Sequence, residues 1–191
     1  MKPGADSPEL RKAYKTCREI ARREAKNFYY AFRVLPKHKS DAMCAVYAFM
    51  RRADDIADDE SMPIAQRRGV MAEWLAGWRA ARSTGVSEDP VFLALNDTQK
   101  RFAIPDALLE ELVQGTTMDL EDDLSGVTRV NVTVHRASGT RQEQLQVYES
   151  FEDLYRYCYL VASVVGLVCI RIFGYTAVSY THLTLPTKRI V

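Results

Sequence analysis

Apolar residues recur every three or four positions along most of the chain, which is the spacing of amphipathic helices. The first such stripe lies between Ser7, a suitable helix N-cap that is followed by proline, and Pro36, which helps to end a helix. The stripe consists of Leu10, Tyr14, Cys17, Ile20 and Ala21. This pattern predicts one helix over the first stretch.

Downstream stripes and start signals predict further helices. Two stripes lie at about residues 38–59 and 63–82. Asp89-Pro90 and Pro105 are typical of helix starts, so two more helices are expected there. The residues predicted to face the core are Ala42, Ala45, Val46, Phe49 and Met50 in the first stretch and Met71, Trp74, Leu75 and Trp78 in the second.

The segment 122–147 breaks the helical pattern. Alternate valines from Val130 to Val134 are followed by a Ser-Gly turn signal, which indicates a short strand or hairpin, or a mobile loop. Ser150 and Asp153 then form a capping box for a helix that runs to about residue 174. The whole pattern predicts one all-α domain.

Composition and charge narrow the range of partners and compartments. The net charge of +1 gives no global basic field, so no nucleic-acid partner is expected. The longest uncharged run, residues 158–170, has 13 residues, whereas a membrane-spanning helix needs about 20. A buried core helix is therefore expected there, with no transmembrane segment, and the N-terminus lacks the apolar region of a signal peptide.

The four cysteines stand singly within apolar helical stretches. This placement favours buried free thiols in a reducing compartment over a disulfide or a zinc site. A cytoplasmic protein is therefore expected.

The segment "RRADDIADDE", residues 51–60, concentrates like charges at the end of a predicted helix. Helical spacing places Asp54 beside Asp58 and Asp55 beside Asp59, and each like-charged pair costs an isolated helix about 0.2–0.5 kcal/mol. Negative charge at a helix C-terminus also opposes the helix dipole. The segment is either a solvated charged face or a site at which a cation offsets the repulsion.

Magnesium is the cation that this spacing suits. Mg²⁺ is held in proteins by one or two carboxylates together with substrate phosphate oxygens, so Asp54 and Asp58 would attract a metal diphosphate. Arg51, one turn earlier, could hold phosphate through two parallel hydrogen bonds. Such an arrangement suits the ionisation of an allylic diphosphate, because the metal stabilises the charge on the leaving group.

Three blocks, "NFYYAFRVLP", "AVYAFMRRADDIADD" and "YRYCYLVASVVGLV", resemble the squalene/phytoene synthase family in order, spacing and neighbours. The resemblance covers about residues 10–176. It implies an all-α class I isoprenoid (terpenoid) synthase fold. It also implies head-to-head condensation of two farnesyl or geranylgeranyl diphosphates through a cyclopropylcarbinyl diphosphate, with Mg²⁺, and with NADPH where the product is squalene.

The resemblance also implies roles for individual residues. Asp54 and Asp58 would be magnesium ligands with Asp55 and Asp59 in support, and Arg51 would contact phosphate. Tyr157 matches the family's tyrosine near the reacting carbons. Phe28, Phe32 and Tyr47 match positions around its prenyl cavity, and Asp119 matches an acidic position on a later helix. Without the resemblance, the four aromatic residues read as ordinary core.

The chain departs from the family pattern in two places. Ala25 and Asn27 replace small hydroxyl residues expected to bind phosphate, so Lys26 or Asn27 would have to substitute. Residues 178–191 resemble translated adaptor sequence and stand where the family continues toward a second aspartate-rich motif. The family domain is therefore expected to occupy residues 1–177, C-terminally truncated and inactive, with a non-native tail.

Alternatives to the head-to-head synthase remain open. One is a non-catalytic helical assembly or scaffold protein of the same family, and another is a class I terpenoid enzyme that uses one substrate. Lipid substrates also leave peripheral membrane contact open. Neither the product type, carotenoid or hopanoid precursor, nor the oligomeric state follows from the sequence.

Overall fold

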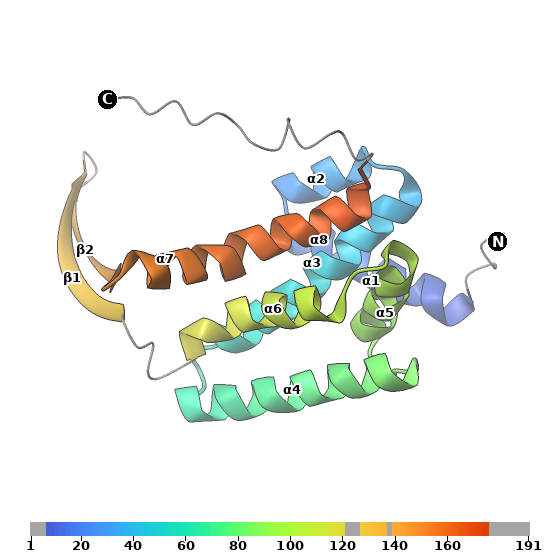
Figure 1. Ribbon diagram of the computed structural model, residues 1–191, viewed down its shortest axis with the longest axis horizontal. Coiled ribbons are helices and arrows are strands. Elements are labelled where there is room, and N and C mark those ends of the chain that lie inside the picture. The colour runs from blue at the N-terminus through green and yellow to red at the C-terminus, as the bar shows by residue number, and fades with distance from the viewer. Residues whose placement is uncertain (1–6, 121–126, 137–138, 176–191) are drawn as a thin grey trace.

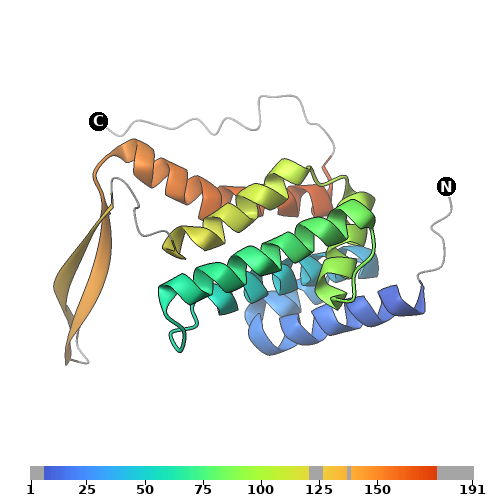
Figure 2. The ribbon, with the colours of Figure 1, turned by 90° about the horizontal axis from the view of Figure 1, so that it is seen from below.

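The computed structural model describes residues 7–120, 127–136 and 139–175, and the tail predicted at residues 178–191 lies outside these ranges. Helices form the body of the molecule, and a two-stranded hairpin projects from one end (Figures 1 and 2). The elements are α1 (Pro8–Glu24), α2 (Asn27–Arg33), α3 (Lys37–Ala57), α4 (Ile64–Thr84), α5 (Pro90–Phe102), α6 (Asp106–Thr117), the 3₁₀ turn η1 (Met118–Leu120), β1 (Val127–Arg136), β2 (Gly139–Tyr148), α7 (Phe151–Cys158), the π-helical turn η2 (Tyr159–Ser163) and α8 (Val164–Phe173).

The first predicted helix is two helices, so that prediction was wrong. Ser7 caps α1 as expected, because its hydroxyl accepts a hydrogen bond from the Leu10 N–H at 3.1 Å. The helix ends at Glu24 with Ala25 as its C-cap, and Lys26 then adopts φ 39° and ψ −102°. A right-handed helix needs negative φ, so α2 starts in a new direction. The apolar stripe carries no sign of this reversal.

The central helix is α3, which contacts α1, α2, α4, α5, α6 and α8. Its buried side is largely alanine, and such small side chains let neighbouring helices approach closely. Phe49 is the bulky exception, since its ring centroid lies 4.8 Å from that of Trp74 and 5.1 Å from that of Trp78. The predicted core positions are confirmed, with Met50 and Trp74 half-buried at its edge.

The segment 122–147 contains a hairpin, which decides between the two structures predicted for it. Strands β1 and β2 pair antiparallel from Val127 opposite Tyr148 to Arg136 opposite Gly139. The hairpin extends away from the helices, with β2 leading into α7 (Figures 1 and 2). The protein is therefore helical with one hairpin added between η1 and α7.

The last described helical stretch follows the predicted capping box. The Ser150 hydroxyl oxygen accepts from the Asp153 N–H at 3.2 Å, and the stretch continues to Phe173. One side of it is buried, but the other side is exposed, so the prediction of a buried core helix was only half right. The buried residues are Leu160, Val164, Val168 and Ile172, and the exposed ones include Val161, Leu167, Ile170 and Phe173.

Among the described residues, Phe151–Phe173 is also the one stretch long and apolar enough to cross a membrane, with a mean hydropathy of 1.7. The prediction from the 13-residue uncharged run had excluded such a stretch. Length and composition are weak evidence by themselves, because core helices of soluble proteins pass the same test.

All four cysteines are free thiols, as predicted, but they are not all buried. Cys17 and Cys44 are buried, and burial raises the pKa of each to about 12. Cys169 is half-buried, and Cys158 is exposed because it lies on the uncovered side of α7. The apolar neighbours of Cys158 in the sequence therefore gave a wrong prediction for that residue.

Candidate active site

A pocket of about 240 Å³ lies between α3, α6 and η2. Carboxylates from the end of α3 and apolar side chains from the other two elements share its wall. The lining residues are Met50, Asp54, Ala57, Asp58, Leu112, Gly115, Thr116, Leu160 and Val161. The two aspartates predicted as magnesium ligands therefore face one cavity.

Helix geometry places Asp54 and Asp58 together. Helix α3 ends at Ala57, and Asp58 keeps a right-handed helical backbone as the C-cap. Its N–H donates to the Asp54 carbonyl oxygen at 2.8 Å, so the two side chains stay one turn apart. Ala53 and Ala57 are buried, which fixes this end of the helix against the core.

The other two aspartates of the cluster have partners outside the pocket. Asp55 forms an ion pair with Arg51 at 2.6 Å. Asp59 accepts hydrogen bonds from the Ser61 N–H at 3.0 Å and the Ser61 hydroxyl at 2.5 Å, and these bonds lower its pKa. The predicted repulsion between Asp55 and Asp59 is therefore avoided, because the helix ends before Asp59.

Arg51 has a donor that suits an anion. It is half-buried, and within the described part of the chain its Nε atom is buried without a hydrogen-bond partner. Glu24 lies nearby, since its pKa is lowered by Arg23 and, to a lesser extent, by Arg51 and Lys26. Lys26 itself is exposed at the start of α2.

The predicted aromatic residues divide into two groups. Phe32 and Tyr47 meet edge to face with ring centroids 6.4 Å apart, and Tyr47 lies one helical turn before Arg51. Burial raises the pKa of Tyr47. Phe28, in contrast, is 67% exposed and does not line the pocket.

Tyr157 lies close to the pocket without lining it. The Tyr157 ring packs on Tyr148 at 5.3 Å, and Val161, which does line the pocket, follows one turn later. Asp119 lies in η1 after α6, and its side chain is outside the part of the chain that the structure describes.

Sequence reasoning missed the residues that join α6 to η2. A Cβ atom on Gly115 would lie 2.8 Å from the Leu160 carbonyl oxygen, so only glycine allows this approach. The Tyr159 hydroxyl donates to the Glu111 carboxylate at 3.0 Å across the same interface, and this bond raises the pKa of Tyr159. A glycine inside a helical pattern was the available signal for Gly115.

The donor set fits magnesium only together with an anionic ligand. Within the described residues, no group of three or more histidine, cysteine, aspartate or glutamate side chains could hold a metal ion. Two carboxylates one turn apart are nevertheless enough for Mg²⁺ when phosphate oxygens complete its coordination. The orphaned Nε of Arg51 is a further donor that phosphate could satisfy.

Comparison with known proteins places these features in a family. Residues 21–184 match the family model for squalene/phytoene synthase. The chain is 34% identical over 166 residues to phytoene synthase of Mycobacterium tuberculosis, a match that covers 87% of this chain and 46% of that protein. It is 30% identical over 176 residues to 15-cis-phytoene synthase of Synechococcus elongatus, covering 91% of this chain and 48% of the relative.

Solved structures give the same result. A crystal structure of a dehydrosqualene synthase matches with a TM-score of 0.64 and 27% identity, over 86% of this chain and 48% of that one. Squalene synthase HpnC from Alicyclobacillus acidocaldarius matches with a TM-score of 0.66 and 25% identity, over 90% of this chain and 55% of the other. The chain thus spans about half the length of the proteins it matches.

Proposed function

We infer a prenyltransferase function for this chain, because it belongs to the squalene/phytoene synthase family and has the helical isoprenoid synthase fold. Family members are prenyltransferases, and membership of the family supports head-to-head condensation of two prenyl diphosphates as the reaction. The chain would supply the part of such an enzyme that binds one prenyl diphosphate. The observation that carries this proposal is the pocket shared by Asp54, Asp58, Leu160 and Val161.

The residues of the pocket suit the first step of the reaction. Asp54 and Asp58 would hold Mg²⁺, which supplies charge neutralisation for a departing diphosphate. Arg51 does not line the pocket itself, but it lies one helical turn before Asp54 and pairs with Asp55, and from there it would bind the same diphosphate. Apolar neighbours such as Leu112 would exclude water from the allylic cation.

The aromatic side chains would act after ionisation. Tyr47 and Phe32 form a half-buried edge-to-face pair, and ring faces attract cations. Tyr157 would approach the reacting carbons from α7, one turn before the pocket wall. Lys26 would add positive charge at the start of α2, whereas Phe28 would need a ligand or another segment to cover it.

Loss of magnesium-dependent binding is the test of this site. We expect inorganic pyrophosphate to bind in the presence of Mg²⁺, and Asp54→Asn or Asp58→Asn to weaken binding at least about tenfold, as changes around metal sites do. Isothermal titration calorimetry with and without Mg²⁺ measures this. Asp106→Asn, an exposed aspartate outside the pocket, is the matched control. Equal affinity in all variants would contradict the proposal.

Catalysis requires more than this pocket. In the described residues one acidic pair lines the cavity, so we expect the 191-residue chain alone to bind magnesium diphosphate weakly and to form no condensed product. Incubation with farnesyl or geranylgeranyl diphosphate, followed by mass spectrometry of the lipid extract, tests this. NADPH belongs to the proposal only where squalene is the product. A cytoplasmic location with peripheral membrane contact fits lipid substrates.

A scaffold function is the second candidate, and the exposed apolar side of α7 and α8 favours it. Such a surface is typical of a binding site for another protein segment. In an enzyme, removal of both carboxylates by Asp54→Ala and Asp58→Ala would abolish turnover of the whole protein. In a scaffold, assembly would survive these changes.

A further inference from the structure

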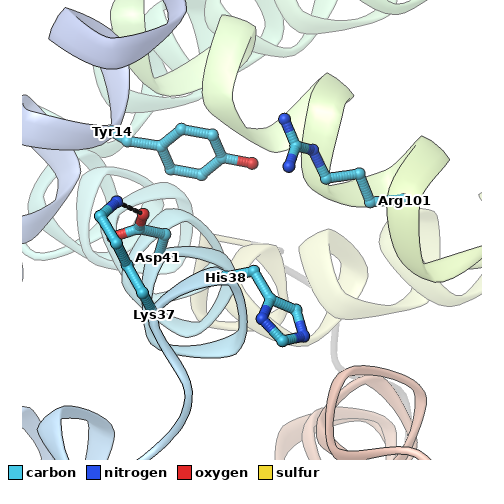
Figure 3. A pocket seen from close by; sticks show the side chains of 5 residues that line it. All are labelled: Tyr14, Lys37, His38, Asp41 and Arg101. Atoms are coloured by element: carbon cyan, nitrogen blue, oxygen red, sulfur yellow. Dashed lines mark hydrogen bonds and ion pairs between the residues drawn. The ribbon is translucent and has the colours of Figure 1, made fainter. Parts of the chain in front are cut away.

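A second pocket, of about 250 Å³, lies at the start of α3 (Figure 3). Asp54 and Asp58 lie at the other end of this helix. Three helices meet at the pocket, with one lining residue from α1, three from the start of α3 and one from the end of α5. The lining residues are Tyr14, Lys37, His38, Asp41 and Arg101. None of them lines the pocket proposed for prenyl diphosphate.

The carboxylate in this pocket is more than neutralised by its partners. Asp41 is buried, and Lys37 and Arg18 each form an ion pair with it at 2.6 Å, from α3 and α1 respectively. A lysine ammonium has three donor hydrogens, and the Lys37 side chain is 81% exposed. Asp41 therefore orients Lys37 without consuming its capacity to bind a ligand.

The opposite wall is fixed by a second network. The Arg101 Nε atom lies 2.5 Å from the Asp97 carboxylate, which also accepts a 2.7 Å hydrogen bond from the Tyr14 hydroxyl. In Figure 3 the Tyr14 hydroxyl and the Arg101 guanidinium point toward each other across the pocket. Together the two networks place three cationic groups, of Arg18, Lys37 and Arg101, against two carboxylates. Within these two networks of described residues, the cationic groups outnumber the carboxylates by one.

We propose that this pocket binds a small oxyanion of the phosphate class. Every side chain that lines it is polar, charged or aromatic with a polar group, and none is aliphatic, so a phosphate group fits it better than a prenyl chain. Lysine and arginine on opposite walls supply a point charge and a planar fork, the two side chains that proteins use for phosphate. The helix dipole of α3 adds positive charge at its N-terminus, and the first turn contains no acidic residue that would offset this charge.

Titration of the full chain with inorganic phosphate tests the site. EDTA is included so that magnesium-dependent binding at Asp54 and Asp58 makes no contribution, and backbone amide shifts are followed by NMR. We expect saturable shifts at Lys37, His38 and Arg101, and Arg101→Gln to raise the half-saturating concentration at least fivefold. Lys100→Gln makes the same charge change in the same helical turn outside the pocket, and we expect it to leave binding unchanged.

A second arm distinguishes a free anion from a lipid headgroup. Vesicles of phosphatidylcholine are compared with vesicles that also contain phosphatidic acid, in a sedimentation assay with the same two variants. Binding of either phosphate source that Arg101→Gln weakens and Lys100→Gln does not would support the site. Absence of saturable binding to both sources, or equal losses in both variants, would overturn it. Circular dichroism confirms that each variant is folded.

Discussion

At the residue scale, Gly115 controls how closely α6 approaches the turn that covers the pocket. Its missing side chain leaves room for the Leu160 carbonyl group, and the Tyr159–Glu111 hydrogen bond holds the two elements in that position. The position is therefore restricted by backbone contact and not by the conformational freedom of glycine. Any side chain would displace η2 and the pocket wall with it.

Gly115→Ala should destabilise the protein by about 1–3 kcal/mol, the cost of overpacking a well-packed interface. Gly69→Ala is the matched control, because a Cβ at Gly69 in α4 meets nothing within 4 Å. That change should stabilise the helix by up to about 1 kcal/mol. Urea unfolding followed by circular dichroism measures both. Similar effects of the two substitutions would show that α6 and η2 do not pack this closely.

The candidate site was predictable where helical spacing alone decides the outcome. Asp54 and Asp58 share one face because they are one turn apart, and the structure places them in one pocket. The hydrogen bonds that Asp59 accepts were not predictable, since they depend on the turn at Ser61 that follows the helix. The exposure of Phe28 likewise depends on the reversal at Lys26, which no periodicity reveals.

At the scale of elements, the pattern predicted every helix from α3 to α6 and the capping box of α7, because apolar stripes and caps are local signals. The break between α1 and α2 and the π-helical turn at Tyr159–Ser163 were not predicted. The first is a positive φ at the single residue Lys26, and the second is a change of hydrogen bonding over five residues. Tertiary packing determines such departures, and the spacing of apolar residues along a helix does not reveal them.

Lys26→Gly should stabilise the protein by about 1 kcal/mol. Lys26 holds a positive φ, which strains a residue with a side chain and suits glycine. Lys12→Gly, at an exposed position inside α1, is the control and should destabilise by about 1 kcal/mol. Thermal unfolding of the two variants measures the difference. A loss of stability in both would mean that α1 continues through Lys26.

At the scale of the whole molecule, one side of the body is left uncovered by the residues that the structure describes. Along α7, η2 and α8, buried residues such as Val164 and Val168 contact the core, while Leu167 and Ile170 on the other side face solvent. Contiguous apolar surface of this kind favours association. Among the described elements, α3 is thus surrounded by other helices, whereas α8 has one exposed apolar side.

Replacing Leu167 and Ile170 by Gln should reduce concentration-dependent self-association and change the free energy of unfolding by less than about 0.5 kcal/mol, as for other surface substitutions. Val168→Gln, on the buried side of the same helix, should destabilise the fold by about 2 kcal/mol or more. Light scattering across a concentration series measures association. An unchanged mass distribution in the double variant would show that this face does not drive it.

The π-helical turn acts on the whole last helix as a phase shift. Each residue of an α-helix advances the chain by about 100° around the axis, so one extra residue in a turn rotates everything after it relative to everything before it. Tyr159–Ser163 therefore determines that Val164, Val168 and Ile172 meet the core. With one residue fewer in this turn, α8 would be rotated by about 100°, and Val165, Cys169 and Phe173 would take the positions at which Val164, Val168 and Ile172 now meet the core.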